Sequence, residues 1–402
     1  MERREFLKLG AAGLAVAGIG LPTSSARAAT HTIELGIVDT QVELIDGTLV
    51  NMLAFTPSRI GQPSVPGPVF RVKEGDTVNF TIHNTRLEDH RFEIPGIDGA
   101  VSDAIPPGGT KTLSFTAPVA GTYMYEDGLM GPLYRVLGLH GVLVVEPLDG
   151  RTASNSQTPF SLDKIGNAQA VRSVSAIFDA LGTSDRFPGS KWVPCPSGEA
   201  YSIQERIWVL NQVDPRFNAL IVPGQPMKKD AALTDDSSAT WTPRYFTINN
   251  RSGFDLAEGD DVVIKNYIGE PTLIRVVNAG LAYHSNHIHG NHVMEMAEAS
   301  LRPGPGFGKP MVRANIFERD VWSMQPGQRK DMLLPVEMPP DIPSAQRAAL
   351  LSGTGQEKMP MRYVMHCHCE MSNTAGGGNY PQGMVTHWDL MGGVGGRRTA
   401  SL

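Results

Sequence analysis

The sequence lacks the excess of basic residues that proteins binding nucleic acids or anionic membrane surfaces carry. Its 35 Lys and Arg are outnumbered by 41 Asp and Glu, which gives a net charge of −6. Because both kinds of partner need clustered Lys and Arg, we exclude nucleic acid and anionic membrane as partners. Hydrophobic residues make up 41% of the chain and charged residues 19%. A sizeable core can therefore form, and global disorder is excluded.

Long apolar runs are also missing, with one exception at the start of the chain. The run Leu9–Leu21 follows Arg3 and Arg4 and precedes Ala26-Arg27-Ala28, a small-x-small cleavage pattern. This order predicts a bacterial twin-arginine export signal over residues 1–29. A membrane anchor, the alternative, needs about 20 apolar residues, more than this run provides. We therefore expect a periplasmic or secreted protein, exported in the folded state, with no membrane span after cleavage.

A sustained helical period of 3.6 residues is absent as well, and the helical candidates are the short segments Ser344–Leu351 and Ala176–Gly182. Glycine (43) and proline (30) are plentiful, as in turn-rich all-β proteins. One order of patterns occurs twice, over Val69–Pro147 and over Asp260–His368. Each copy has an alternating strand, a Pro-Gly turn, a second strand and an aromatic-bearing strand that ends at polar residues. The repetition predicts an all-β protein with two Greek-key β-sandwich domains.

The repeated pattern also predicts the domain boundaries. We expect the first domain over residues 30–147 and the second over residues 201–391. Residues 148–200 are rich in Ser, Gly and Pro, which is typical of a long linker with some local order. Residues 392–402 are expected to form a flexible tail.

Cysteine is scarce, with three residues in the chain, and two of them stand in the segment His366-Cys367-His368-Cys369. An odd number in an exported protein leaves one thiol outside any disulfide. Cys369 is a candidate disulfide partner for Cys195, and such a pair would leave Cys367 as the remaining thiol.

Histidine is concentrated in the expected second domain. Seven of the 11 histidines fall there in three short stretches. They are His284, His287, His289 and His292, then His366 and His368, then His387. Residues two apart on a strand face the same way, so two adjacent strands would gather four imidazoles on one face. These are His287, His289, His366 and His368.

The opposite face of the same two strands would carry the Cys367 thiol together with His284. Imidazole and thiolate suit copper, and a cysteine with one or two histidines and a distant methionine describes a blue-copper electron-transfer site. Zinc is a rival ion for the same ligands. A buried strand without metal is disfavoured, because unpaired imidazoles and a thiol are costly to bury. His90, outside these stretches, is expected to be a hydrogen-bonded strand residue rather than a ligand.

Two motifs, His284-Ser-Asn-His-Ile-His-Gly290 and His366-Cys-His368, resemble those of the multicopper oxidases. The resemblance covers most of the mature chain and is strongest from Tyr245 to Leu390. It implies two cupredoxin-like domains and copper as the cofactor. Carried over to this chain, it implies metal binding by the residues of both faces. These are His284, Cys367 and Met384 at a type 1 copper, with Met384 as axial ligand, and His287, His289, His366 and His368 at a second copper site.

The sequence departs from the family at the type 1 site. The family places a second histidine a few residues after the cysteine, where this chain has Cys369-Glu-Met-Ser-Asn373. Glu370, Met371 and His387 are the candidate replacements, and a site without a replacement is the alternative.

The first domain departs further. His90-Arg-Phe-Glu-Ile-Pro-Gly96 and Tyr123–Asp127 stand where the family has two His-x-His pairs. Half of the histidines of a trinuclear copper cluster are therefore missing. We expect a first domain that has largely lost its metal ligands.

The resemblance implies a periplasmic copper oxidoreductase. Electrons from a small-molecule or metal-ion reductant would enter at Cys367 and pass through His366 and His368 to the histidine-bound copper, with oxygen as the expected acceptor. These three residues are therefore the candidate catalytic residues. A copper storage or delivery protein, which the lost ligands favour, and a copper-free structural protein are the alternatives. A homo-oligomer, such as the trimers common among two-domain relatives, stays open by analogy.

Overall fold

The computed structural model describes residues 28–228, 241–299, 307–354 and 359–396. The expected export signal lies outside these residues up to position 27, as does the end of the expected tail from position 397. Among the described residues, no helix is long and apolar enough to cross a membrane.

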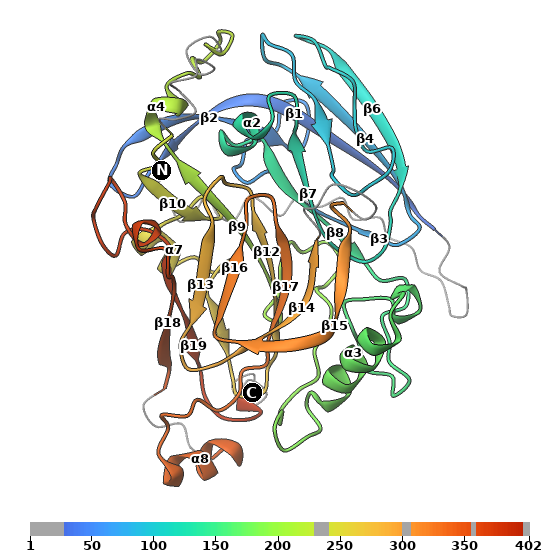
Figure 1. The fold of residues 1–402 in the computed structure, drawn as a ribbon, viewed down its shortest axis with the longest axis vertical. Helices are drawn as coiled ribbons and strands as arrows, with labels where there is room; N and C mark the ends of the chain where they lie inside the picture. The colour runs from blue at the N-terminus through green and yellow to red at the C-terminus, as the bar shows by residue number, and fades with distance from the viewer. Residues whose placement is uncertain (1–27, 229–240, 300–306, 355–358, 397–402) are drawn as a thin grey trace.

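Two four-stranded sheets make up the first sandwich, which occupies the upper part of Figure 1. One sheet has the strand order β2-β1-β4-β6 and the other β3-β8-β7-β5. The strands are β1 (Thr30–Glu43), β2 (Leu49–Thr56), β3 (Val69–Lys73), β4 (Thr77–Asn84), β5 (Phe92–Glu93), β6 (Thr110–Thr116), β7 (Gly121–Asp127) and β8 (His140–Glu146). Residues of β4 alternate between buried and half-buried, so Phe80 points inward. Its ring packs against Phe92 and Phe115 in the core between the sheets.

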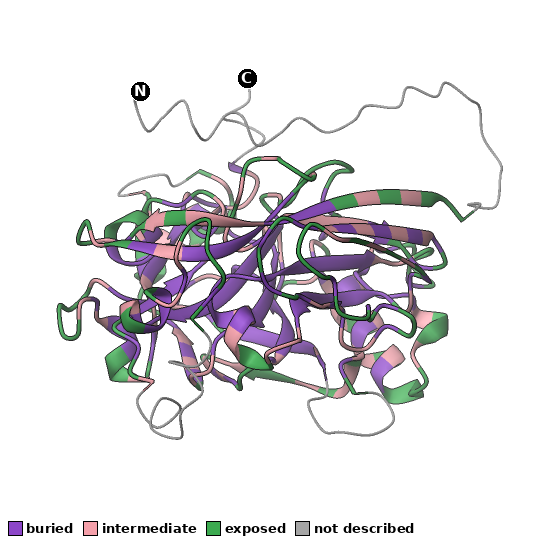
Figure 2. Ribbon diagram, turned by 90° about the horizontal axis from the view of Figure 1, so that it is seen from above, coloured by how far each residue is buried: buried purple, intermediate pink, exposed green. Residues whose placement is uncertain are grey.

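A six-stranded and a five-stranded sheet make up the second sandwich. Their orders are β10-β9-β12-β17-β14-β15 and β11-β19-β18-β13-β16. The strands are β9 (Glu205–Val213), β10 (Tyr245–Ile248), β11 (Ile264–Asn266), β12 (Thr272–Asn278), β13 (His284–Ile288), β14 (Val293–Ala299), β15 (Pro310–Arg319), β16 (Val321–Met324), β17 (Arg329–Leu334), β18 (Met361–Cys367) and β19 (Val385–Leu390). Trp208, Trp322 and Trp388 fill its core, and Figure 2 shows the buried residues gathered along the strands. The predicted all-β class with two sandwiches is confirmed.

Helices are few and short in the described part of the chain. They are α2 (Pro132–Val136), α3 (Ala168–Ala180), α4 (Pro215–Asn218), α7 (Gly253–Ala257) and α8 (Ser344–Leu351), with 3-10 turns η1 (Leu162–Lys164) and η2 (Glu370–Asn373). The predicted bounds of α8 are confirmed, whereas α3 begins eight residues before the predicted Ala176. The Asn167 side chain caps the helix by accepting from the N–H groups of Gln169 and Ala170. Val174 and Phe178 of α3 pack with Trp192 into a core of their own beside β15, so residues 148–200 contain a packed helix.

A buried ionic network joins the two sandwiches. The Arg275 guanidinium donates to Glu205 over 2.9 Å and reaches Asp331 at 3.4 Å. Thr122 of the first sandwich donates to the Asp331 carboxylate over 2.5 Å. Arg71, also in the first sandwich, lies 2.5 Å from Glu205. Since Arg275, Glu205 and Asp331 are each at most 2% exposed, these charges depend on one another for compensation.

Replacing Arg275 with alanine should therefore destabilise the protein strongly. The change leaves two buried carboxylates without their main cation, which costs about 3–5 kcal/mol. The free energy of unfolding in urea measures the effect. Replacing the exposed Lys164, which lies 3.5 Å from the exposed Asp163, should change it by less than about 1 kcal/mol. Equal effects of the two substitutions would contradict the structural role of the network.

Candidate metal centre

Strands β13 and β18 bring the two histidine motifs together. They pair antiparallel, with His287 opposite His366 and Asn286 opposite Cys367. His284, Asn286 and Ile288 are buried while Ser285 and His287 are half-buried, so successive residues face opposite sides of the sheet. The two strands lie side by side as the sequence predicted, because their period-two patterns fit one register.

The outer side of this strand pair carries four imidazoles, which we call the four-histidine face: His287, His289, His366 and His368. Ring nitrogens of the first three lie within 4.8 Å of one another. His289 Nε2 is 3.2 Å from His366 Nε2, and His368 Nε2 is 2.8 Å from His287 Nδ1. His289 and His368 are exposed, so the cluster is open to solvent in the single chain.

Two of the four imidazoles, those of His287 and His366, are also in the protonation state that metal binding requires. Burial lowers the pKa of His287, and the neighbouring imidazoles lower it further. Burial also lowers the pKa of His366. Both rings are therefore neutral at pH 7, the form in which imidazole binds a metal.

The inner side carries Cys367 and His284, both fully buried. The Cys367 Sγ atom lies 3.6 Å from His284 Nδ1. The backbone N–H groups of Ser285 and Cys369 donate to the sulfur over 3.3 and 3.4 Å. Burial lowers the pKa of His284 to about 4, so this ring is neutral. A metal ion between sulfur and nitrogen would take the place of a proton.

Two polar residues that the sequence reasoning missed hold this inner site. The Gln212 amide nitrogen lies 2.7 Å from His284 Nε2, while its oxygen accepts from the N–H groups of Leu281 and Ala282. The Asn373 side chain accepts from Cys367 N–H over 3.2 Å and donates to the Cys367 carbonyl over 2.7 Å. Gln212 lies 72 positions from His284, whereas Asn373 lies 6 positions from Cys367. The sequence pattern alone marks neither residue as a contact of the site.

Met384 reaches the same core through the turn before β19. It is 2% exposed and belongs to the apolar cluster that contains Cys367. Its N–H donates to the Ser372 carbonyl over 2.7 Å, and Gly383 N–H donates to Asn373 over 3.0 Å. The long segment between Cys367 and Met384 is thus tied back to β18.

The candidate replacements for the missing histidine lie elsewhere. His387 pairs with Val364 across β18 and β19, on the side opposite Cys367. Its ring contacts the Ala257 carbonyl at 2.9 Å and the Asp389 carboxylate at 2.8 Å. Glu370 and Met371 are exposed. The structure therefore does not support His387 as a ligand beside Cys367. It also does not support Glu370 or Met371 in that role.

The candidate disulfide between Cys369 and Cys195 is not formed, because all three cysteines are free. The Cys195 thiol faces the Glu199 carbonyl in its own loop. The Cys369 thiol donates to the Tyr283 carbonyl over 3.3 Å, next to His284. The structure thus places the Cys369 sulfur at the edge of the inner site.

His90 of the first sandwich is a hydrogen-bonded residue, as predicted. Its Nδ1 lies 2.5 Å from the Asp127 carboxylate, and its ring packs 4.7 Å from the Tyr134 ring, between centroids. Burial lowers the pKa of His90, but contacts with Asp127 and Glu88 outweigh it and leave the pKa raised. His140 is held by the Arg135 carbonyl at 2.7 Å.

The stability that His90 contributes should depend on pH. A raised folded-state pKa adds stability that is fully present below the unfolded value of about 6.5 and is lost as pH rises through the folded value. We expect the wild-type protein to lose stability over this window, and the His90→Gln variant to lose less. Urea unfolding from pH 5.5 to 9 measures this. A wild-type profile identical to that of the variant would contradict the raised pKa.

Comparison with known proteins finds similarity to copper proteins over parts of the chain. Residues 60–150 match the model of a multicopper oxidase domain. The chain is 32% identical over 158 residues to copper resistance protein A of Pseudomonas syringae pv. tomato, over 36% of this chain and 26% of that protein. It is 34% identical over 113 residues to a copper-containing nitrite reductase of Alcaligenes xylosoxydans xylosoxydans, over 26% and 32% of the two chains. These matches span about a quarter to a third of the curated relatives.

Solved structures show the same fold over nearly the whole chain. The blue copper oxidase of Nitrosomonas europaea superposes with a TM-score of 0.60 at 20% identity, over 90% of this chain and 86% of that one. The copper nitrite reductase of the same organism gives 0.52 at 17% identity, over 90% and 94%. The chain therefore has the cupredoxin fold of these copper proteins.

Proposed function

We propose that this protein is an exported copper oxidoreductase of multicopper oxidase type. It takes electrons from a reducing substrate at the inner site of Cys367 and His284. It delivers them to oxygen or another small acceptor at the four-histidine face. The observation that carries this proposal is the register of β13 and β18, which places a buried thiol and imidazole on one side and four imidazoles on the other.

The donor atoms fit copper. Thiolate, imidazole and the thioether of Met384 are the ligands of blue-copper sites, and clustered imidazoles suit copper as well. Cys367, His284 and Met384 would hold one ion, and His287, His289, His366 and His368 would hold copper on the outer side. Copper bound there would supply one-electron redox chemistry.

The protein's own contribution is the connection between the two sides. Cys367 is bonded directly to His366 and His368 through the chain, so the two sites are separated by the length of a single residue. Two backbone N–H groups contact the Cys367 sulfur, and the Gln212 side chain contacts the His284 ring. These contacts hold the two ligand side chains in position. The four-histidine face is open to small molecules from solvent.

Export to the periplasm is part of the proposal and is supported by Arg3, Arg4 and the apolar run that follows. The names of the relatives, a blue copper oxidase, a copper resistance protein and copper nitrite reductases, support the copper chemistry.

Copper storage without turnover is the second candidate function. His90 and His140 of the first sandwich are engaged by their own neighbours, so neither completes the four-histidine face within the chain. An exposed, partly complete imidazole cluster favours binding over catalysis.

Copper analysis together with oxygen uptake distinguishes these functions. We expect the copper-loaded protein to hold at least two copper ions per chain and to consume oxygen when a reductant such as a catechol is supplied. Bound copper without oxygen uptake would favour storage, and a protein that binds no copper would favour a structural role.

A further inference from the structure

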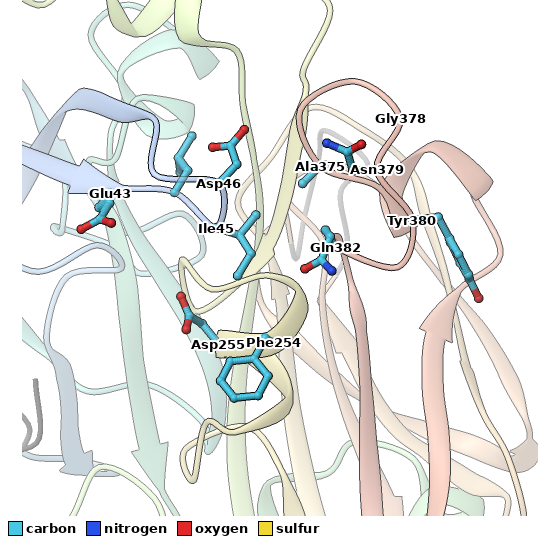
Figure 3. Close-up of a pocket in the computed structure, with 11 residues that line it drawn as sticks. Glu43, Ile45, Asp46, Phe254, Asp255, Ala375, Gly378, Asn379, Tyr380 and Gln382 are labelled. Atoms are coloured by element: carbon cyan, nitrogen blue, oxygen red, sulfur yellow. The ribbon is translucent and has the colours of Figure 1, made fainter.

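A cleft opens between the first sandwich and the loop that leads to Met384. Its volume is about 930 Å³. The hairpin between β1 and β2 forms one wall, and α7 and the loop of residues 375–382 form the others (Figure 3).

The lining combines negative charge with exposed aromatic rings. Glu43, Asp46 and Asp255 contribute carboxylates, and the described lining residues include no Lys, Arg or His. Phe254 and Tyr380 are 68% and 69% exposed. Carboxylates and aromatic faces together attract an organic cation that carries a ring of its own.

The walls of the cleft are held in place by hydrogen bonds. Tyr245 donates its hydroxyl to the Asp46 carboxylate over 2.8 Å, and Thr48 N–H donates to it over 3.1 Å. Arg244 binds the loop through the Gly376 carbonyl oxygen, although it is not among the lining residues.

The cleft is also connected to the inner site. Gln382, on its wall, precedes Gly383, whose N–H donates to the Asn373 carbonyl over 3.0 Å. The Asn373 side chain in turn bonds both the N–H and the carbonyl of Cys367. Asn373 thus links the cleft wall to the backbone of Cys367.

We propose that this cleft admits the reducing substrate, and that the substrate is an aromatic reductant with a cationic amino group, such as a catecholamine. This inference rests on the proposed function, because it assumes that electrons enter at Cys367. Oxidation of one catechol to its quinone releases two electrons and two protons. Two such oxidations supply the four electrons and four protons that convert one oxygen molecule to two water molecules.

Three catechols that differ only in the charge of the side chain test the proposal. They are dopamine, a cation; 4-ethylcatechol, which is neutral; and 3-(3,4-dihydroxyphenyl)propanoate, an anion. With copper-loaded protein at low ionic strength, we expect kcat/KM to be about threefold to tenfold higher for the cation than for the neutral catechol, the range that two partly exposed ion pairs provide. The anion should react more slowly than either, and added salt should reduce the differences.

A double variant, Glu43→Gln with Asp255→Asn, should remove the preference for the cation, so that its kcat/KM for dopamine falls to its value for 4-ethylcatechol. The matched control is Asp103→Asn with Asp163→Asn, which removes two carboxylates that are 90% and 71% exposed and do not line the cleft. This control should keep the preference, although it changes the net charge by the same amount.

Equal kcat/KM values for the three catechols, or a preference that survives in the cleft variant, would overturn the proposal. If no catechol is oxidised at all, the proposed oxidase function fails instead. Equilibrium dialysis of dopamine against the same proteins then tests binding in the cleft independently of oxidase activity. Binding that is weakened in the cleft variant and not in the control supports it, and binding that is equal in both or absent overturns it.

Discussion

Replacing Cys367 with serine should remove the copper of the inner site and reduce the rate of substrate oxidation by more than about 100-fold. Loss of a residue that only hydrogen-bonds a metal ligand already costs roughly 10- to 100-fold in metal affinity or activity. The sulfur is fully buried beside His284, and two backbone N–H groups face it. Serine provides a hydroxyl that does not ionise there, so the soft anionic ligand is lost. Copper analysis, the intense visible absorption of thiolate-bound copper and steady-state oxidation rates measure the change.

The matched control for this variant is Cys195→Ser. Cys195 is also a buried free thiol, and burial raises its pKa to about 11, so it stays protonated. We expect copper content and oxidation rate to be unchanged. A Cys367→Ser protein that keeps its absorption and its rate would remove the inner site from the mechanism.

Replacing His287 and His289 with alanine should affect the outer copper and leave the copper of the inner site in place. Both side chains belong to the four-histidine face, and His289 Nε2 lies 3.2 Å from His366 Nε2. We expect loss of the outer copper and a decrease in oxygen uptake of more than about 100-fold, by the same comparison with residues that only hydrogen-bond a metal ligand. The visible absorption of the Cys367 site should remain, because His284 and Cys367 are untouched.

His292→Gln is the control for this double variant. His292 follows the same motif but is exposed and lies outside the described imidazole cluster. Its replacement should leave copper content and oxygen uptake as they are. If the double variant still reduces oxygen at the wild-type rate, the acceptor must react somewhere other than the four-histidine face.

The strand period explains which parts of the site were predictable. His287, His289, His366 and His368 recur at intervals of two, and this pattern alone specifies that they share a face if the strands pair. The same rule explains why His387, opposite Val364, lies on the side of β18 away from Cys367. The bounds of α8 were also evident locally, because Pro343 precedes it and Gly353 follows it.

Features that depend on long-range packing were not predictable. Gln212 contacts His284 from 72 positions away, and the β1–β2 hairpin reaches the cleft from the other sandwich. The missed start of α3 has a similar cause, since its apolar side is fixed by Trp192 and β15 rather than by a long amphipathic pattern. Whether Cys369 pairs with Cys195 could not be decided from the sequence, because spacing along the chain says nothing about where Cys195 lies in the fold.

The most direct test of the central claim is the electron paramagnetic resonance spectrum of the copper-loaded protein, with the integrated spin compared with total copper per chain. Occupation of both sides of β18 predicts a type 1 signal with narrow hyperfine splitting, together with further copper that is type 2 or silent. A single ordinary type 2 signal from one copper ion or fewer would show that Cys367 does not hold a type 1 copper, and would contradict the oxidoreductase proposal in favour of copper binding.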